Sequence, residues 1–339
     1  MSHLFLYFLS LLIALALCAA SLPLLRRALA PWLGDAPTKL KNHSGIVPAA
    51  GGCAVVLGFF GSLAAVRLLT HFPTGTLTNL RGIFIGGALV FAAGIIDDVK
   101  KPAGISPWAK LACQLLAAAV LIHYGISVQF LPQPWGYALT LLWVAGITNA
   151  LNLFDIMDGL AAGQAVLAAA AFAVISLPYE FIYVNFAAAA LAGACIGFLP
   201  YNHSAKLKTF LGDSGSNLLG FLLAACALGA RYSARSPLAV FAPIIILALP
   251  IFDTVFVSLV RISKGISPLK GTPDHFPLRL ERAGLSRKTV LCICMAAALV
   301  YGILAYIATK APAPWPAVIY VLTAADLILF GGFLLWKTK

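Results

Sequence analysis

Charged residues are scarce in this chain of 339 residues. Only 10% of the residues are Asp, Glu, Lys or Arg, and 61% are hydrophobic, whereas a soluble domain carries about 25% charged residues. No stretch of the sequence is long and polar enough for a separate soluble domain. The shortage of charge excludes a water-soluble globular protein and favours one integral-membrane domain over residues 1–339.

The sequence also lacks the pattern of a cleaved signal peptide and the pattern of a disulfide-rich protein. No Lys or Arg precedes the first apolar run, although a cleaved signal peptide starts with positive charge; Arg26 and Arg27 follow the run instead. We therefore expect a retained membrane anchor. The seven cysteines lie in or beside apolar runs, where they are interpreted as small hydrophobic residues rather than disulfides or zinc ligands.

The apolar runs predict an all-α fold, namely a polytopic transmembrane helix bundle. About 20 apolar residues cross the hydrocarbon layer as a helix, and this length divides the chain into about 10–11 spans. The expected spans are 4–22, 47–69, 82–96, 107–123, 137–150, 160–176, 181–199, 215–229, 238–260, 289–309 and 315–336.

The basic residues are unevenly distributed between the two sides of this bundle. Most of the 23 Lys and Arg residues fall in the loops of one side, which the positive-inside rule makes cytoplasmic. The N-terminus is then outside and the C-terminus cytoplasmic. The net charge of +12 reflects this topology and attraction to anionic lipid, so nucleic acid is not an expected partner.

The few carboxylates gather at the predicted cytoplasmic ends of the spans. An aspartate at the bilayer centre costs roughly 2.5–3.5 kcal/mol, so an apolar chain is expected to keep such residues only at a wet functional site. The sequence between Asn149 and Gly163 joins two spans and carries two of them. The clustered carboxylates are Asp97, Asp98, Asp155, Asp158, Asp213, Asp253 and Asp274.

The spacing of these residues separates their expected tasks. Asp97 and Asp98 point about 100° apart on a helix, so they are expected to act differently. Asn149, Asn152, Asp155 and Asp158 recur every three residues and would form one polar stripe if the segment stays helical.

Residues 212–216 read G-D-S-G-S at the start of a span. Free N–H groups at such a start bind phosphate, which makes Gly212 and Ser214 candidate substrate contacts. The alternative is that Asp213 only caps the helix.

Carboxylates with several Lys and Arg at one membrane face suit a divalent cation and phosphates. Mg²⁺ uses one or two carboxylates together with phosphate oxygens, and phosphoryl transfer depends mainly on positioning and charge neutralisation. A cation- or proton-coupled transporter is the alternative from another class, but its site lies near the membrane midplane. The predicted placement at the cytoplasmic ends favours the enzyme.

Taken together, the motifs resemble the polyprenyl-phosphate N-acetylhexosamine-1-phosphate transferase family. The matching segments are P-A-A-G-G at 48–52, D-D-V-K-K at 97–101, N-A-L-N-L-F-D-I-M-D-G-L-A at 149–161, N-H-S-A-K-L-K-T-F-L-G-D-S-G-S-N-L-L-G-F at 202–221, D-T at 253–254 and D-H-F-P-L-R-L at 274–280. They occur in the order that the family has.

The resemblance implies Mg²⁺-dependent transfer of a sugar-1-phosphate from a UDP-sugar to polyprenyl (undecaprenyl) phosphate, with release of UMP. Mn²⁺ is the alternative ion. The location implied is the cytoplasmic face of the bacterial inner membrane, at the first membrane step of cell-envelope polysaccharide synthesis. The short loops favour GlcNAc-1-phosphate, and the phospho-MurNAc-pentapeptide branch is the alternative. A homodimer is left open.

The resemblance also implies roles for particular residues. Asp213 would be the metal ligand, with Asp155 as a second candidate. Asp97 and Asp98 would engage the lipid phosphate, with one of them as the candidate base, while Asp155 and Asp158 would line the nucleotide-sugar side; all four are implied to be catalytic. The implied substrate-binding residues are Lys101, Lys110, Asn152, Asn202, Gly212, Ser214, His275 and Arg279.

Two departures from the family pattern affect recognition of the donor. Ile156 replaces the first glycine of D-G-x-D-G. The loop motif H-x-H-H keeps only His275, because Pro277 and Leu278 stand at the other two positions. A catalytically inactive homologue that binds lipid phosphate is therefore a third hypothesis.

Overall fold

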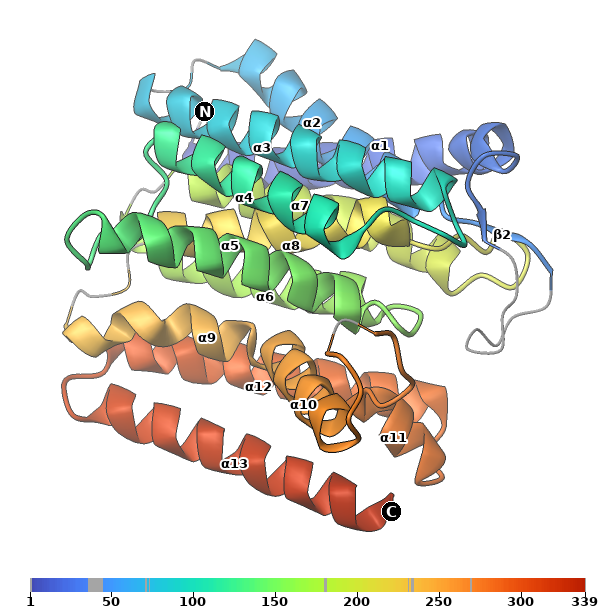
Figure 1. Ribbon diagram of the computed structural model, residues 1–339. Helices are drawn as coiled ribbons and strands as arrows, with labels where there is room; N and C mark the ends of the chain where they lie inside the picture. Colours follow the sequence, from blue (N-terminus) through green and yellow to red (C-terminus); the bar gives the residue numbers. More distant parts are fainter. Residues whose placement is uncertain are drawn as a thin grey trace. The chain divides into compact units, whose positions relative to one another are not determined.

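The computed structural model describes residues 2–35, 45–70, 72, 74–179, 182–230, 232, 235–268 and 270–338. The described chain is almost entirely helical (Figure 1). It divides into two compact units, Met1–Ala230 and Arg231–Lys339, which are described separately.

The first unit is a helix bundle with one short antiparallel hairpin, in which Gly34 pairs with Pro48. The hairpin consists of β1 (Gly34–Asp35) and β2 (Val47–Pro48). The helices are α1 (His3–Leu29), α2 (Gly51–Leu69), α3 (Thr74–Val99), α4 (Pro107–His123), α5 (Trp135–Phe154), α6 (Leu160–Ser176), α7 (Ile182–Asn202) and α8 (Gly212–Gly229), with a 3₁₀ turn at Leu177–Tyr179.

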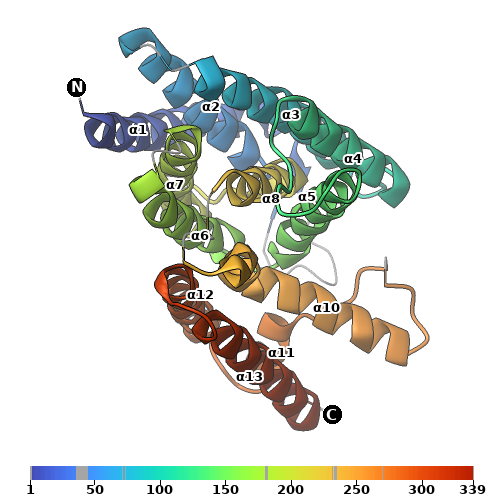
Figure 2. The ribbon, with the colours of Figure 1, turned by 90° about the vertical axis from the view of Figure 1, so that its left-hand side faces the viewer.

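Helix α8 lies in the middle of this unit, and the other helices surround it (Figure 2). All its residues except Asp213 and Leu228 are buried. Glycines on neighbouring helices allow this close packing. A Cβ added at Gly94 would lie 2.4 Å from the Cα of Ser214, and one at Gly52 would lie 2.5 Å from the N of Gly215. The Gly-Gly pair at 51–52 therefore serves helix packing.

The lengths and compositions of the helices support a multi-pass membrane protein. In the described part of the chain, seven helices are long and apolar enough to cross a membrane, or eight if one bent pair forms a single span. Pro107–His123 and Leu160–Ser176 are shorter apolar helices. The prediction of a polytopic helical membrane protein is confirmed at this level, whereas the finer number of spans stays a prediction.

The described part of the second unit contains one interrupted helix, one short helix and two long helices. Its elements are a 3₁₀ helix (Pro237–Phe241), α9 (Ala242–Ile246), α10 (Ala248–Ser263), α11 (Phe276–Arg282), α12 (Arg287–Lys310) and α13 (Trp315–Lys337). The segment predicted as one span over 238–260 is bent by 70° between Ile246 and Ala248. Pro250 explains the break, since its ring clashes with the carbonyl four residues earlier and it has no N–H to donate.

An interhelical hydrogen bond joins the two long helices of this unit. The hydroxyl of Tyr301 on α12 donates to the carboxylate of Asp326 on α13 over 2.8 Å. Asp326 is nevertheless exposed on the surface of the unit.

Candidate functional site

Asp98, near the end of α3, holds the first turn of α8. Its two carboxylate oxygens accept hydrogen bonds from the backbone N–H groups of Asp213 and Ser214, both at 2.9 Å. Gly212 has a φ of +77°, and a Cβ there would lie 2.6 Å from Asp98 Oδ2, so glycine allows this approach. The N–H groups that the sequence suggested would be free for phosphate are thus occupied by an aspartate.

Asp97 makes a separate set of contacts. One carboxylate oxygen accepts the N–H of Ile105 at 2.7 Å, and the other accepts the ammonium group of Lys110 at 2.7 Å. These contacts fix the chain segment between α3 and α4. The adjacent aspartates thus make different contacts, Asp97 with α4 and the segment before it and Asp98 with α8; the different roles expected for them stay a prediction.

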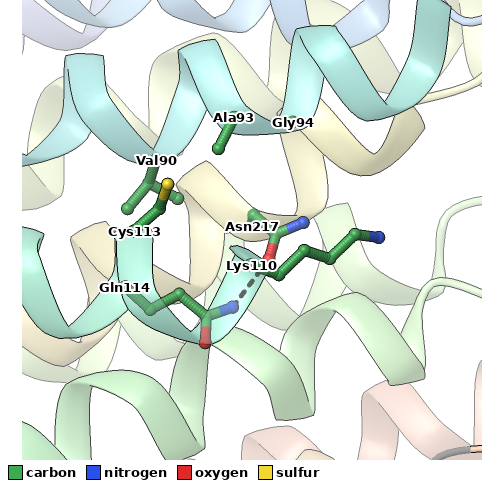
Figure 3. A pocket seen from close by; sticks show the side chains of 7 residues that line it. All are labelled: Val90, Ala93, Gly94, Lys110, Cys113, Gln114 and Asn217. Atoms are coloured by element: carbon green, nitrogen blue, oxygen red, sulfur yellow. Dashed lines mark hydrogen bonds between the residues drawn. The ribbon is translucent and has the colours of Figure 1, made fainter. Parts of the chain in front are cut away.

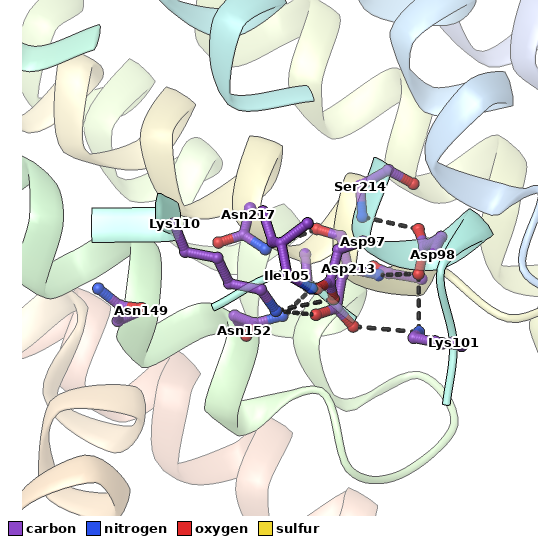
Figure 4. Close-up of polar contacts among 12 residues, drawn as sticks. Asp97, Asp98, Lys101, Ile105, Lys110, Asn149, Asn152, Asp213, Ser214 and Asn217 are labelled. Carbon is purple, nitrogen blue, oxygen red and sulfur yellow. Dashed lines mark hydrogen bonds and ion pairs between the residues drawn. The ribbon is translucent and has the colours of Figure 1, made fainter. Parts of the chain in front are cut away.

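Two lysines connect these aspartates to Asp213 (Figure 4). Lys110 lies 2.7 Å from one Asp213 oxygen, and Lys101 lies 3.1 Å from the other and 2.7 Å from Asp98. We call Asp97, Asp98, Lys101, Lys110 and Asp213 the carboxylate–ammonium cluster. Its three carboxylates and two ammonium groups leave one net negative charge when all are ionised.

Exposure divides the cluster into a buried base and an accessible rim. The side chains of Asp98 and Asp97 are 0% and 5% exposed, whereas those of Asp213, Lys101 and Lys110 are 22–24% exposed. Burial alone would lower the pKa of Lys101, but the charges of Asp213 and Asp98 outweigh it and raise that pKa. The accessible rim therefore presents ammonium groups that stay charged at neutral pH, together with one carboxylate.

A ladder of side-chain amides lies next to the cluster. Gln114 on α4 donates to Asn149 on α5 at 3.2 Å and to Asn217 on α8 at 3.3 Å, and Asn149 donates back to Gln114 at 2.6 Å. Asn217 also donates to the backbone carbonyl of Asp213 at 2.7 Å. We call Gln114, Asn149 and Asn217 the amide ladder. It joins α4, α5 and α8 next to the cluster.

A small pocket opens beside this ladder (Figure 3). Helices α3, α4 and α8 all contribute to its lining, with Lys110 and Gln114 among the lining side chains. The remaining lining residues are Val90, Ala93, Gly94, Cys113 and Asn217. The pocket thus combines an apolar wall with one ammonium group and two amides.

The polar stripe expected along residues 149–158 is interrupted in the structure. Helix α5 ends at Phe154, and residues 155–159 form a turn. Asp155 therefore follows the helix as its cap, and Asp158 lies beyond the stripe. Burial, together with the negative charge of Asp213, raises the pKa of Asp155 to about 7.

Asp158 and Asn202 connect this turn to the segment after α7. Asp158 forms an ion pair with Lys208. Asn202 accepts the N–H of Gly159 at 2.6 Å and donates to the carbonyl of Thr209 at 3.0 Å. Both groups of the Asn202 amide are therefore bonded to backbone. Asn152, predicted with them, donates to the hydroxyl of Ser216 at 2.9 Å.

The remaining predicted residues lie in the second unit. His275 Nδ1 lies 2.6 Å from a carboxylate oxygen of Asp253, whose other oxygen accepts the N–H of Phe276 at 2.9 Å. Arg279 pairs with Asp274 at 3.0 Å and donates to the hydroxyl of Thr338 at 2.6 Å. These contacts fix the loop between α10 and α11.

The donor set of the cluster suits a divalent cation only if the substrate supplies further ligands. Among the described residues, no three His, Cys, Asp or Glu side chains are grouped closely enough to hold a metal ion. Mg²⁺ needs only one or two protein carboxylates when phosphate oxygens complete its shell. Asp213 fits this requirement, because its carboxylate is partly accessible and its present partners are lysines, whose ammonium groups are of a kind that can bind phosphate instead.

These features define a polytopic helical membrane protein with a buried carboxylate–ammonium site. The sequence model of glycosyl transferase family 4 matches residues 80–231, which include the whole cluster. The chain is 31% identical over 288 residues to a probable undecaprenyl-phosphate N-acetylglucosaminyl 1-phosphate transferase of Bacillus subtilis, covering 82% of this chain and 77% of the relative. The chain therefore belongs to glycosyl transferase family 4.

Two other relatives place the chain within this family. A decaprenyl-phosphate N-acetylglucosaminephosphotransferase of Mycolicibacterium smegmatis is 33% identical over 76% of this chain and 71% of its own length. A phospho-N-acetylmuramoyl-pentapeptide-transferase of Heliobacterium modesticaldum is 36% identical, but over only 58% of this chain and 63% of its own length. The more extensive similarity is thus to the N-acetylglucosamine relatives.

Sequence reasoning missed two residues that support the site. Asn217 bonds the carbonyl of Asp213, and the signal was its position four residues later on the same helix. Lys208 pairs with Asp158 across 50 residues of sequence, and no local spacing indicates that contact.

Proposed function

We propose that this protein transfers GlcNAc-1-phosphate from UDP-GlcNAc to a polyprenyl phosphate such as undecaprenyl phosphate, with release of UMP. The observation that carries the proposal is the carboxylate–ammonium cluster, in which α3, α4 and α8 join three aspartates to two partly exposed lysines. The names of the extensively similar relatives support the same donor sugar and lipid acceptor.

The lysines are proposed to neutralise the charge of the phosphates. Lys101 and Lys110 each contact Asp213, and an incoming phosphate would compete for the same ammonium groups. Asp213 would then be available to hold Mg²⁺ or Mn²⁺, with Asp155 as a second candidate ligand. When bound, the ion would neutralise the charge that develops on the transferred group.

Burial separates the proposed roles of the aspartates. Asp98 and Asp97 are bonded to backbone N–H groups and lysines, so we assign them to holding α8 and the α3–α4 segment in place. The pKa of Asp155 is raised to about 7, which suits a group that accepts a proton at neutral pH. We therefore favour Asp155 as the proton acceptor over its alternative role as a second metal ligand.

The other predicted residues are proposed to shape the donor side. Asn202 and Asp158 connect the turn before α6 to the segment after α7. Asn152 donates a hydrogen bond to Ser216. His275 and Arg279 fix the loop after α10. Their contribution to donor binding would then act through the backbone that they position.

The wider setting follows from the same proposal. We place the protein in the bacterial inner membrane as a single transferase domain of about 11 spans. The site would face the cytoplasm, the N-terminus would be outside and the C-terminus inside. The product would supply cell-envelope polysaccharide synthesis, and a homodimer is compatible with this arrangement.

A panel of donors tests the proposal directly. The full chain in detergent would be given Mg²⁺, polyprenyl phosphate and, in turn, UDP-GlcNAc, UDP-GalNAc and UDP-MurNAc-pentapeptide, and UMP would be measured. We expect release with UDP-GlcNAc. Release with UDP-MurNAc-pentapeptide alone would support the muramoyl branch. If no donor gives UMP release, the transferase assignment is contradicted. Substrate counterflow in liposomes without polyprenyl phosphate would then support a transporter.

A further inference from the structure

Gln114 is the centre of the amide ladder, although it contacts none of the charged groups. Its side chain is 2% exposed. It bonds Asn149 on α5 and Asn217 on α8 at the same time. A buried amide that hydrogen-bonds two other helices restricts both the rotation of its own helix about the helix axis and its position along that axis. Gln114 therefore sets the position of α4 within the bundle.

Lys110 depends on that position. It lies four residues before Gln114, one turn earlier on the same face of α4. Its ammonium group lies 2.7 Å from both Asp97 and Asp213. A lysine side chain has four flexible carbons and a large rotamer entropy, so holding its end between two carboxylates requires a fixed starting point on the helix.

The ladder also holds Asp213, the residue that Lys110 contacts. Asn217 accepts from Gln114 and donates to the backbone carbonyl of Asp213. One chain of hydrogen bonds thus links the helix of Lys110 to the residue that Lys110 neutralises. Lys101 reaches Asp213 from the end of α3 instead, and its contacts do not include the ladder.

We propose that Gln114 is a positioning residue that holds the ammonium group of Lys110 between Asp97 and Asp213. Gln114 does not touch the substrate; it acts through α4 and the amides of Asn149 and Asn217. Its effect on turnover rests on the proposed function, whereas its effect on Lys110 does not.

Amine labelling of the full chain tests this assignment without using the reaction. The protein in detergent is treated briefly with an acetylating reagent, and modification of Lys110 and Lys101 is followed by peptide mass spectrometry. Gln114→Met keeps the length of the side chain but loses the two hydrogen bonds that Gln114 donates and the one that it accepts. We expect Lys110 to react at least about fivefold faster, since the loss of a single hydrogen bond already produces an effect of this size. Lys101 should keep its wild-type rate.

The matched control is Thr140→Val near the start of α5. It removes a buried hydroxyl that accepts the N–H of Val128 and donates to the carbonyl of Gly136. It should change neither labelling rate. An unchanged Lys110 rate in Gln114→Met would overturn the proposal. So would equal acceleration of Lys101 and Lys110, because that result indicates general loosening. If Gln114→Met does not fold, Gln114→Glu, which loses both donated bonds, is read by the same criteria.

Turnover provides a separate readout. If the transferase assignment holds, Gln114→Met should lower kcat by about the same factor as it raises Lys110 labelling. Accelerated Lys110 labelling in a protein whose wild type releases no UMP would retain the positioning role and reject only the proposed reaction.

Discussion

The carboxylate of Asp98 accepts the backbone N–H of Asp213 over 2.9 Å, although 115 residues separate them in the sequence. A negative charge at this end of a helix is favourable, because the unpaired N–H groups and the helix dipole both attract it. The contact places the carboxylate of Asp213 beside Lys101 and Lys110. Asp98 is therefore the residue on which the geometry of the cluster depends.

Replacing Asp98 tests its role as a cap. Asp98→Asn can accept only one of the two N–H groups with its amide oxygen, and it loses its charge attraction to Lys101. We expect a loss of about 1–2 kcal/mol of stability, as is typical for a lost helix cap. Thermal unfolding in detergent measures this loss. Wild-type stability in Asp98→Asn would remove the capping role.

Gly94 tests the close packing of α3 against α8. A Cβ at this position would lie 2.4 Å from the backbone of Ser214, so Gly94→Ala must displace the start of α8. Overpacking of this kind costs roughly 1–3 kcal/mol, and activity should fall as well. Gly146→Ala is the matched control, because a Cβ there meets nothing within 4 Å. Equal stability of the two variants would contradict this packing.

The fold class and most residues of the carboxylate–ammonium cluster could be predicted from the sequence, because they follow from local composition. Apolar runs indicate helices, and carboxylates at the ends of such runs indicate a wet site. The helical repeat alone predicts that Asp97 and Asp98 point in different directions, and the two side chains do contact different helices; their different roles stay a prediction. The contact of Lys110 with Asp213 depends on the packing of both α4 and α8 against α3 and α5, which no local pattern contains.

Other features could not be predicted because tertiary contacts override local signals. Gly212 and Ser214 have the pattern of a phosphate site, yet a buried carboxylate from another helix accepts the N–H groups of Asp213 and Ser214. The spacing of three along residues 149–158 would give one polar stripe only if the segment stayed helical, and α5 ends at Phe154. Asn202 bonds two backbone groups, which no local pattern indicates, and its expected role in substrate binding stays a prediction.

The pKa of Asp155 predicts the pH dependence of turnover. Burial and the charge of Asp213 raise that pKa to about 7, so Asp155 is mostly protonated below this pH and mostly charged above it. If Asp155 accepts a proton, kcat should rise with pH through about 7, with roughly one-tenth of the upper rate at pH 6. Asp155→Asn should be much slower and lack this rise. A rise of the same shape in Asp155→Asn would assign it to another group.

Asp253 provides a prediction for the second unit. It is fully buried and accepts from both His275 and the N–H of Phe276. Asp253→Leu leaves these groups buried without an acceptor, which costs about 1–3 kcal/mol for each group. We expect faster hydrogen exchange in residues 270–282. Thr254→Val, which loses only a bond to the carbonyl of Pro250, is the control and should exchange as the wild type does.

The most direct test of the transferase assignment is UMP release by Asp213→Asn. The assay contains UDP-GlcNAc, polyprenyl phosphate and Mg²⁺, with the wild type measured in parallel and folding checked by thermal unfolding. Since Asn cannot supply the carboxylate proposed to hold the ion, we predict release by the wild type and loss of at least about 100-fold in the variant, or roughly 2.7 kcal/mol of barrier. A folded Asp213→Asn protein with a near-normal, Mg²⁺-dependent rate would contradict the account.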